Sequence, residues 1–312
     1  MTDILTVTLN PALDLSTSTD KVMDTHKLRC SAATFHPGGG GINVARVMHR
    51  LGGDCLALYP AGGANGKRLQ QLLDQEQVRS HCIEIAGETR ESFSVHENSS
   101  GRDFRFVLPG PELTPGEWQA CLAHVSELQT PPRYLVASGS LPPGAPVDFY
   151  ARLARQARAC GSLLVLDTSG PALAAALAES VYLVKPSLRE LRELTGRPLD
   201  TERQWREAAQ KIIRDGQAQV VALSLGEDGA LLVTAKQALR ARSLPVKVAS
   251  SIGAGDSFVG GLLWALSRHE DLEPAFRYGM AAGAAALLAA GTALCQAADV
   301  ERLHNEVSIT PA

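Results

Sequence analysis

The sequence predicts an α/β fold in which helices cover both faces of a mainly parallel central sheet. Short apolar runs of the kind found in buried strands occur at residues 56–60, 134–137, 163–166, 182–184 and 220–223. Helical patterns separate most of them, for example at residues 151–159 and 201–214, and such alternation implies right-handed crossovers between parallel strands. Aromatic residues make up only 5% of the 312 residues. That low share favours helices packed on a sheet over an all-β sandwich.

The chain begins with a strand pattern. Residues 4–9 alternate β-branched and other residues and end at Asn10-Pro11, which predicts a strand followed by a turn. Helical spacing follows over residues 42–51 and stops at two glycines. Much later, residues 278–298 carry no charge, a stretch long enough to nominate a membrane span. Because Ala and Gly dominate it, we predict instead a small-residue helix packed inside the domain.

A β-hairpin interrupts this α/β rhythm. Residues 92–96 and 103–107 both alternate, and residues 98–101 (Asn-Ser-Ser-Gly) supply the turn between them. Such an insertion either merely completes the fold or closes over a ligand. We favour the second interpretation, a lid.

Charge and cysteine content exclude several classes of protein. The formal net charge is -3 and no basic run occurs, so neither nucleic acid nor an anionic membrane surface is an expected partner. The absence of a basic segment followed by an apolar one at residues 1–4 argues against a signal peptide. Six scattered cysteines without a C-x-x-C pair predict buried free thiols in a reducing cytoplasm rather than a zinc site or disulfides. They are Cys30, Cys55, Cys82, Cys121, Cys160 and Cys295.

The sharpest chemical signal is a glycine-rich turn, Gly253-Ala254-Gly255-Asp256, that runs into an apolar helix extending to about Leu266. Free N–H groups and the dipole at a helix start attract phosphate. Asp256 is then either the N-cap of this helix or a base that removes a proton from a hydroxyl beside the phosphate. The spacing alone leaves both interpretations open.

A second glycine run, Gly38 to Gly41 after Pro37, precedes Asn43. Four glycines let a ligand approach the backbone closely, and the Asn43 carboxamide can bind hydroxyls. The run is not a dinucleotide fingerprint, because Asn43 occupies the position of its third glycine. Gly66-Lys67-Arg68 is not a P-loop either, since Arg68 replaces the Ser or Thr that such a loop requires.

Taken in order, six motifs resemble those of the ribokinase-like carbohydrate kinases of the phosphofructokinase-B type, over essentially the whole chain. They span residues 8–14, 38–46, 138–144, 183–186, 224–230 and 253–256. The resemblance implies one ribokinase-like three-layer α/β/α domain over residues 1–312, with a small β lid formed by parts of about 10–37 and 88–110. The Lys27-Leu28-Arg29-Cys30 segment, and the lack of a lysine in the first glycine run, are most similar to the minor bacterial 6-phosphofructokinase branch.

The family resemblance also implies roles for individual residues. The sugar hydroxyls would be held by Asp14, Gly38, Gly39, Gly40, Gly41, Asn43 and Ser140. Asp256 would act as the base, while the amides of Gly253, Ala254 and Gly255 stabilise the transferred γ-phosphoryl. Candidates for the phosphate of the substrate are Lys27, Arg29, Arg90 and Arg105. The ATP site would contain Lys185, Ser187, Ser224, Gly226 and Gly229, and Glu190 would hold Mg²⁺ through water.

The implied activity is ATP-dependent phosphorylation of fructose 6-phosphate at its 1-hydroxyl, a glycolytic step, by a cytoplasmic homodimer that pairs through the lid. Alternatives are a tagatose-6-phosphate kinase, a 1-phosphofructokinase or a catalytically idle sugar-phosphate-binding protein. ATP and Mg²⁺ are the expected cofactors, with K⁺ as a further candidate. Two departures from the family bear on them. Ser187 stands where the family has Asn, which predicts looser Mg²⁺ placement, and Ala289 and Ala293 replace polar residues near a monovalent-cation site.

Overall fold

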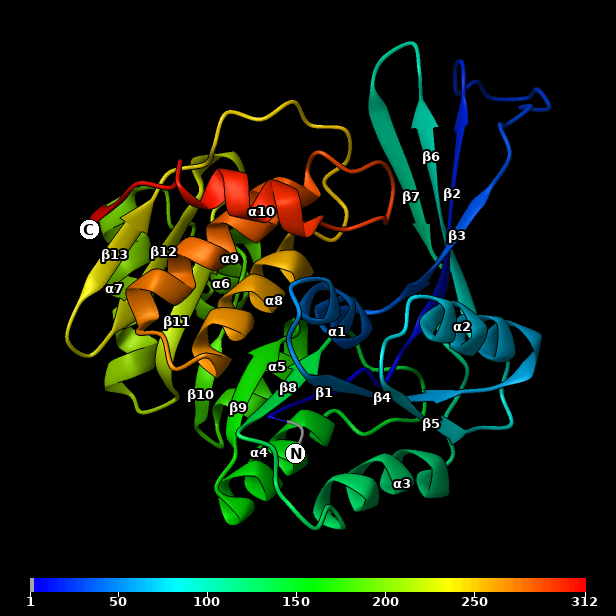
Figure 1. Cartoon of the computed structure of the whole chain (residues 1–312). Coiled ribbons are helices and arrows are strands. Elements are labelled where there is room, and N and C mark those ends of the chain that lie inside the picture. Colours follow the sequence, from blue (N-terminus) through cyan, green and yellow to red (C-terminus); the bar gives the residue numbers. More distant parts are fainter. Residues whose placement is uncertain (1–2) are drawn as a thin grey trace.

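The computed structural model describes residues 3–312 and contains a large and a small sheet (Figure 1). The large sheet has ten strands in the order β14-β13-β12-β11-β10-β9-β8-β1-β4-β5. Their bounds are β1 (Ile4–Val7), β4 (Cys55–Ala61), β5 (Ser80–Glu84), β8 (Tyr134–Ser138), β9 (Leu163–Asp167), β10 (Val181–Val184), β11 (Ala218–Ser224), β12 (Ala230–Thr234), β13 (Ala238–Ala241) and β14 (Ile309–Pro311). Seven neighbouring strands of this sheet, β5, β4, β1, β8, β9, β10 and β11, are mutually parallel. Strands β12, β13 and β14 add an antiparallel edge beside β11. The predicted mainly parallel sheet is confirmed.

Two layers of helices enclose this sheet. The helices are α1 (Gly40–Arg50), α2 (Gly63–Gln75), α3 (Pro115–Ser126), α4 (Phe149–Cys160), α5 (Gly170–Leu177), α6 (Leu188–Thr195), α7 (Glu202–Arg214), α8 (Ala254–Ser267), α9 (Leu272–Ala286) and α10 (Ala297–His304). One core joins the sheet to α1, α2, α8, α9 and α10, and the other joins it to α3–α7. Neighbouring strand residues belong to opposite cores, Val165 to the first and Leu164 to the second. This burial on both faces explains why the strands are continuous apolar runs.

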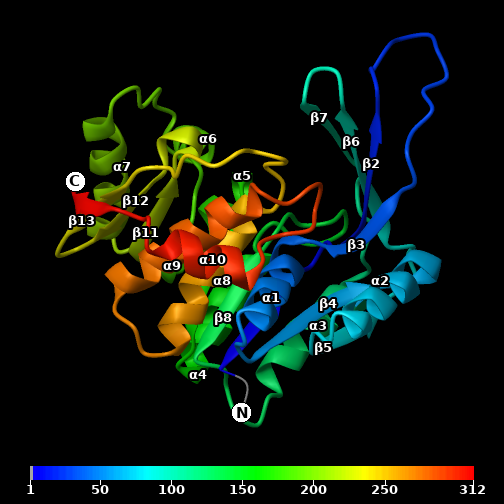
Figure 2. The same ribbon diagram turned by 45° about the horizontal axis from the view of Figure 1, so that its top comes forward.

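The small sheet projects from one side of the large one, as Figures 1 and 2 both show. Its strand order is β3-β2-β6-β7, with β2 (Ala12–Thr19), β3 (Thr34–Gly38), β6 (Arg90–Glu97) and β7 (Arg102–Val107). The predicted hairpin is the antiparallel β6–β7 pair, and β2 joins it in parallel to β6. The long connection between β2 and β3 lies at the free tip of this sheet (Figure 2).

The helix predicted over residues 278–298 is only half correct. Helix α9 ends at Ala286, the chain then turns, and α10 starts at Ala297. Gly291 and Leu294 take left-handed backbone conformations with φ of 57° and 62°, which a helix cannot continue through. The small residues of α9 serve close packing against α8, because a Cβ on Gly279 would lie 3.1 Å from the Phe258 carbonyl oxygen. The contact is tight from the side of α8 too, since a Cβ on Gly261 would lie 2.6 Å from the Tyr278 carbonyl oxygen. Within residues 3–312, no helix is long and apolar enough to cross a membrane.

The cysteine prediction also needs correction. All six thiols are free, and Cys55, Cys121 and Cys295 are buried as expected. Cys82 is half-buried, whereas Cys30 and Cys160 are exposed. The first of these lies in the β2–β3 connection and the second is the last residue of α4, so neither faces a core.

Candidate active site

Asp256 lies in the first turn of α8, but it does not cap that helix. The N-cap is Gly253, whose φ of 78° is left-handed and which has no side chain to act as a cap. Glycine is favoured there, because that φ strains other residues and a Cβ would lie 2.3 Å from Leu294 Cδ2. The N-cap interpretation of Asp256 is therefore wrong. The first amides of α8, those of Ala254 and Gly255, have no intrahelical acceptor and remain available to an anion.

The carboxylate of Asp256 is held by a residue from the other end of the chain. Asn43, in the first turn of α1, donates from Nδ2 to Asp256 Oδ2 over 2.8 Å. Asp256 is half-buried. Burial, reinforced by the negative charge of Asp167, raises its pKa to about 6, although Asn43, Lys185 and Arg105 act in the opposite direction. A carboxyl group with such a pKa is suited to accept a proton near neutral pH.

Lys185 and Asp167 form a buried ion pair next to this carboxylate. Lys185 directly follows β10, and Asp167 is the last residue of the adjacent parallel strand β9. Lys185 Nζ lies 3.1 Å from Asp167 Oδ1. Burial lowers the pKa of Lys185, but Asp167, Glu190 and Asp256 outweigh it and leave the pKa raised. A Cβ on Gly255 would lie 3.5 Å from Lys185 Nζ, so the ammonium group reaches the start of α8. A cation at this place can neutralise phosphate oxygens.

The first glycine run lies beside Asp14 and at the start of α1. Asp14 is buried on β2 opposite β3, and burial raises its pKa to about 6 despite the nearby Arg105, Arg46 and Arg90. A Cβ on Gly38 would lie 2.3 Å from the Asp14 carboxyl, so only glycine leaves that carboxyl free. A Cβ on Gly40 would lie 2.2 Å from Ser138 Oγ. Gly39, with φ of 116°, is the N-cap of α1, and Gly41 is buried within its first turn.

The cationic candidates for the substrate phosphate have different environments. Arg90 donates to three backbone carbonyls, those of Asn10, Pro11 and Leu108. Arg105, on β7, is exposed and makes no side-chain hydrogen bond or ion pair with residues 3–312, yet its charge acts on both Asp14 and Asp256. Ser140 is connected to the same region, because Asn10 Nδ2 donates to Ser140 Oγ over 3.1 Å.

Lys27 and Arg29 are not near Asp14 of the same chain. Both are exposed in the β2–β3 connection at the tip of the small sheet. The Arg29 carbonyl accepts a hydrogen bond from Thr19 Oγ1, and Thr19 is the last residue of β2. Thr19 lies five positions along the strand from Asp14, which corresponds to about 16 Å.

The remaining predicted residues lie along the carboxyl edge of β10 and β11. Ser187 and Ser224 form an isolated parallel bridge, and Ser224 N donates to the Pro186 carbonyl over 2.9 Å. Gly226 and Gly229 have left-handed φ values of 62° and 92° in the turn that follows β11. Because the edge outside parallel strands is where α/β sheets bind ligands, these residues are well placed for a nucleotide.

Ser187 is the N-cap of α6 and forms a capping box with Glu190. Its hydroxyl accepts from Glu190 N over 3.2 Å, and Glu190 Oε2 accepts from Ser187 N over 2.7 Å. One carboxylate oxygen of Glu190 is thus used in the cap, which leaves the other for a metal-bound water. Residues 3–312 contain no cluster of three or more His, Cys, Asp or Glu that could hold a metal. A metal here would depend mainly on waters and phosphates, as Mg²⁺ commonly does.

Sequence reasoning missed Asp167 and Arg46. A signal for the first was available: the apolar run at residues 163–166 ends directly in an aspartate, at the ligand-binding edge of the predicted sheet. Arg46 follows Asn43 by three residues and so lies on the same helix face. That a charged residue would be fully buried there could not be read from spacing.

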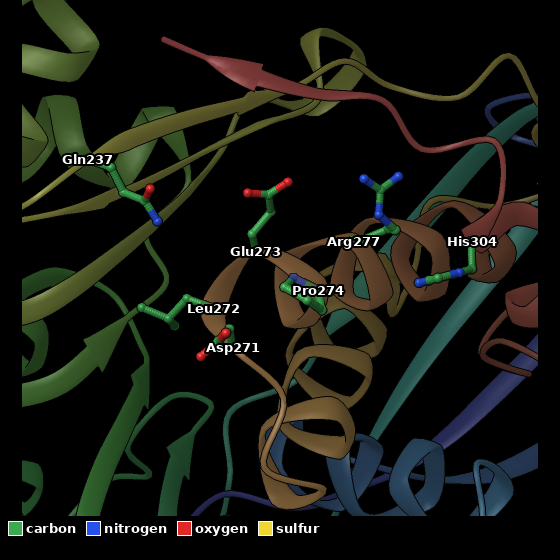
Figure 3. Close-up of a pocket in the computed structure, with 7 residues that line it drawn as sticks. All are labelled: Gln237, Asp271, Leu272, Glu273, Pro274, Arg277 and His304. Carbon is green, nitrogen blue, oxygen red and sulfur yellow. The ribbon is translucent and has the colours of Figure 1, made fainter.

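A prominent surface hollow does not coincide with this site. It measures about 710 Å³ and lies between the β12–β13 turn, the start of α9 and the end of α10 (Figure 3). Its lining residues are Gln237, Asp271, Leu272, Glu273, Pro274, Arg277 and His304. None of the predicted site residues contributes to it, so chemistry and not cavity volume identifies the site.

An anion-binding helix start, a carboxylate poised to take a proton and a buried lysine define a phosphotransferase site on an α/β fold. Residues 6–299 match the model of the pfkB family carbohydrate kinases, and the chain belongs to this family. It is 48% identical, over 97% of its length and 89% of the relative, to ATP-dependent 6-phosphofructokinase isozyme 2 of Mycobacterium tuberculosis. It is 42% identical, over 99% of its length and all of the relative, to the Escherichia coli isozyme 2.

Solved structures agree with this assignment. The phosphofructokinase-2 of E. coli in complex with potassium superposes with a TM-score of 0.93 at 42% identity, covering 98% of this chain and 99% of that one. The same enzyme in complex with fructose 6-phosphate gives a TM-score of 0.92 at 41% identity, with the same coverage. The chain is also 38% identical, over 84% of its length and 83% of the relative, to a 1-phosphofructokinase of Xanthomonas campestris. The ribokinase-like three-layer fold expected from the resemblance is confirmed.

Proposed function

We propose that this protein transfers the γ-phosphoryl group of ATP to the 1-hydroxyl of fructose 6-phosphate, a glycolytic reaction of the cytoplasm. The observation that carries the proposal is the contact of Asp256 with Asn43 at the start of α8. Asp256 takes the proton of the 1-hydroxyl as its oxygen attacks the γ-phosphorus, and the bond from phosphorus to the β-phosphate oxygen breaks. Amides of Gly253, Ala254 and Gly255 stabilise the charge on the transferred group.

The other residues divide between the two substrates. Asp14, Asn43, Ser140 and the backbone of the first glycine run would hold sugar hydroxyls. Lys185, together with Ser187, Ser224, Gly226 and Gly229, would line the ATP site. Mg²⁺ would be held through water by Glu190 and by the ATP phosphates. We include potassium as a candidate activator because the E. coli structure contains it, although Ala289 and Ala293 offer it no side-chain ligand.

A coupled ADP-release assay across a panel of sugar phosphates tests this function. We expect the highest kcat/KM with fructose 6-phosphate and lower values with tagatose 6-phosphate and fructose 1-phosphate, whose acceptors differ by an epimeric hydroxyl or a moved phosphate. A preference for fructose 1-phosphate would favour the 1-phosphofructokinase alternative. If no ADP is released with any of these sugar phosphates, the alternative of a catalytically idle sugar-phosphate-binding protein would be favoured.

Replacing Arg105 with alanine should raise the KM for fructose 6-phosphate about ten- to a hundred-fold, because a charge-assisted contact contributes roughly 1.5–3 kcal/mol. The stability of the fold should not change, since Arg105 binds no other residue in the described chain. Arg102→Ala is a matched control: it lies on the same strand, on the opposite face, and pairs with Glu97. Equal KM values for Arg105→Ala and the wild type would mean that the phosphate binds elsewhere.

The small sheet is also the proposed dimer interface and lid. Five of the seven exposed large hydrophobic residues among residues 3–312 belong to this sheet, to its tip or directly follow β7, namely Met23, Leu28, Phe106, Val107 and Leu108. A tetrameric form of the E. coli enzyme supports self-association of this kind of chain. Because Lys27 and Arg29 lie far from their own Asp14, they could bind substrate phosphate only at the site of a partner copy.

Phe106→Ser should therefore weaken the dimer at least about tenfold in sedimentation equilibrium, since burying such a side chain contributes about 1.5–3 kcal/mol in each subunit. Val147→Ser serves as control, because Val147 is similarly exposed, 54% against 47% for Phe106, but lies outside the small sheet. If both variants sediment like the wild type, the lid is not the interface.

A further inference from the structure

Arg46 is the most deeply buried charged residue next to the proposed site. It lies on α1 with no exposed side-chain surface, and its Nε and Nη2 bind both carboxylate oxygens of Glu76 at 2.9 and 2.7 Å. Its Nη1 faces three acceptors: the Pro37 carbonyl at 2.9 Å, Asn43 Oδ1 at 3.3 Å and the Thr292 carbonyl at 3.4 Å. The guanidinium therefore joins α2, the end of β3, the Asn43 side chain and the turn after α9.

The contact with Asn43 has a chemical consequence. A carboxamide has one accepting end and one donating end, whereas arginine can only donate. With Arg46 against Oδ1, the Nδ2 end of Asn43 faces Asp256 Oδ2 at 2.8 Å. The reversed carboxamide would set two donors against each other at Arg46 and two oxygens against each other at Asp256.

We infer that Arg46 is a positioning residue that orients the Asn43 carboxamide so that it donates a hydrogen bond to Asp256. This inference rests on the proposed role of Asp256 as the base. The donated bond holds the carboxylate in one orientation and favours its ionised form, which is the form that accepts a proton. The other charged groups that act on Asp256 are Asp167, Lys185 and Arg105; none of them bonds to the Asn43 carboxamide.

A double-mutant cycle between positions 46 and 43 tests the inference. Arg46→Gln introduces a side chain that can also accept, so the Asn43 carboxamide loses its preferred orientation. We expect kcat to fall about ten- to a hundred-fold, the range that small displacements of reacting groups produce, while KM for ATP changes less than about threefold. In an Asn43→Ala background the same substitution should change kcat by less than about threefold, because the group that it acts through is gone. Arg46→Lys, which can only donate, should retain more of kcat than Arg46→Gln.

Arg50→Gln provides the matched control. Arg50 lies one turn further along α1, pairs with the same Glu76 and donates to the Cys295 carbonyl, but it does not contact Asn43. It should lower Tm, although by less than Arg46→Gln because Arg50 is less buried, and it should leave kcat within about threefold of the wild type. If Arg46→Gln fails to fold, Glu76→Gln takes its place in the cycle. Glu76 is partly exposed, and its replacement weakens the ion pair that holds Arg46.

Equal losses of kcat from Arg46→Gln in the wild-type and Asn43→Ala backgrounds would overturn the inference, as would an equal loss from Arg50→Gln. Either result would make Arg46 a structural ion pair only. These outcomes are distinct from a failure of the proposed base. That failure would appear as retained turnover in Asp256→Asn, whether or not positions 46 and 43 are coupled.

Discussion

Replacing Asp256 with asparagine should lower kcat by about two to four orders of magnitude while binding of ATP and sugar phosphate is largely retained, because a general base contributes about that factor. Asparagine keeps an oxygen that can accept from Asn43 but cannot take the proton of the hydroxyl. Steady-state kinetics and isothermal titration with both substrates measure the two effects. Asp299→Asn is the matched control, since Asp299 occupies the third position of α10 as Asp256 does of α8. A variant that retains more than about a tenth of the wild-type kcat would remove Asp256 from this role.

The same substitution should stabilise the fold near neutral pH. The Asp256 carboxyl has a pKa of about 6 in the folded protein, against an ordinary value of 3.8. The folded state is therefore destabilised progressively as pH rises from about 4 to about 6. At pH 7 this amounts to about 3 kcal/mol, which an uncharged asparagine does not incur. Denaturation of the variant at pH 7 should therefore require more urea, whereas a simple folding defect would require less.

The wild-type kcat should fall below about pH 6, as the base becomes protonated.

Replacing Lys185 with methionine should destabilise the protein by about 3–5 kcal/mol, because removing one partner of a buried ion pair leaves the other charge unpaired. The pair is well enclosed, with 7% of the Lys185 side chain and 15% of the Asp167 side chain exposed. Urea denaturation at pH 7 measures the loss. The exposed pair Lys211–Asp215 provides the control, since Lys211→Met should cost only about 0.2–1 kcal/mol.

The pH dependence of Lys185→Met identifies the cause of its instability. Burial raises the pKa of Asp167, and Lys185 opposes that rise. Without the lysine, the pKa of Asp167 should be higher still, so the deficit should shrink as pH falls and the buried carboxylate takes a proton. Adding Asp167→Leu should recover most of the stability. A deficit independent of pH, and unchanged in the double variant, would show that lost packing and not the unpaired charge is responsible.

The sequence alone determined the layers of the fold and the chemistry of its motifs. Strands buried on both faces have to be apolar throughout, so runs such as residues 163–166 are visible without a structure. A turn that passes through left-handed φ, as at Gly253, favours glycine. The phosphate-binding start of α8 could therefore also be predicted from the sequence. Both signals are local, and they depend on the properties of neighbouring residues only.

Only the tertiary structure decided which distant side chains meet. Asn43 and Asp256 are 213 positions apart, and nothing in either motif specifies that a carboxamide from α1 contacts a carboxylate on α8. The same holds for the burial of Arg46, and for Lys27 and Arg29, whose charges suit a phosphate although the small sheet carries them away from their own site. The physical reason is that hydrogen bonds and ion pairs depend on distance and orientation. Packing of α1 against α8 and the length of β2 set both, and neither has a local signature in the chain.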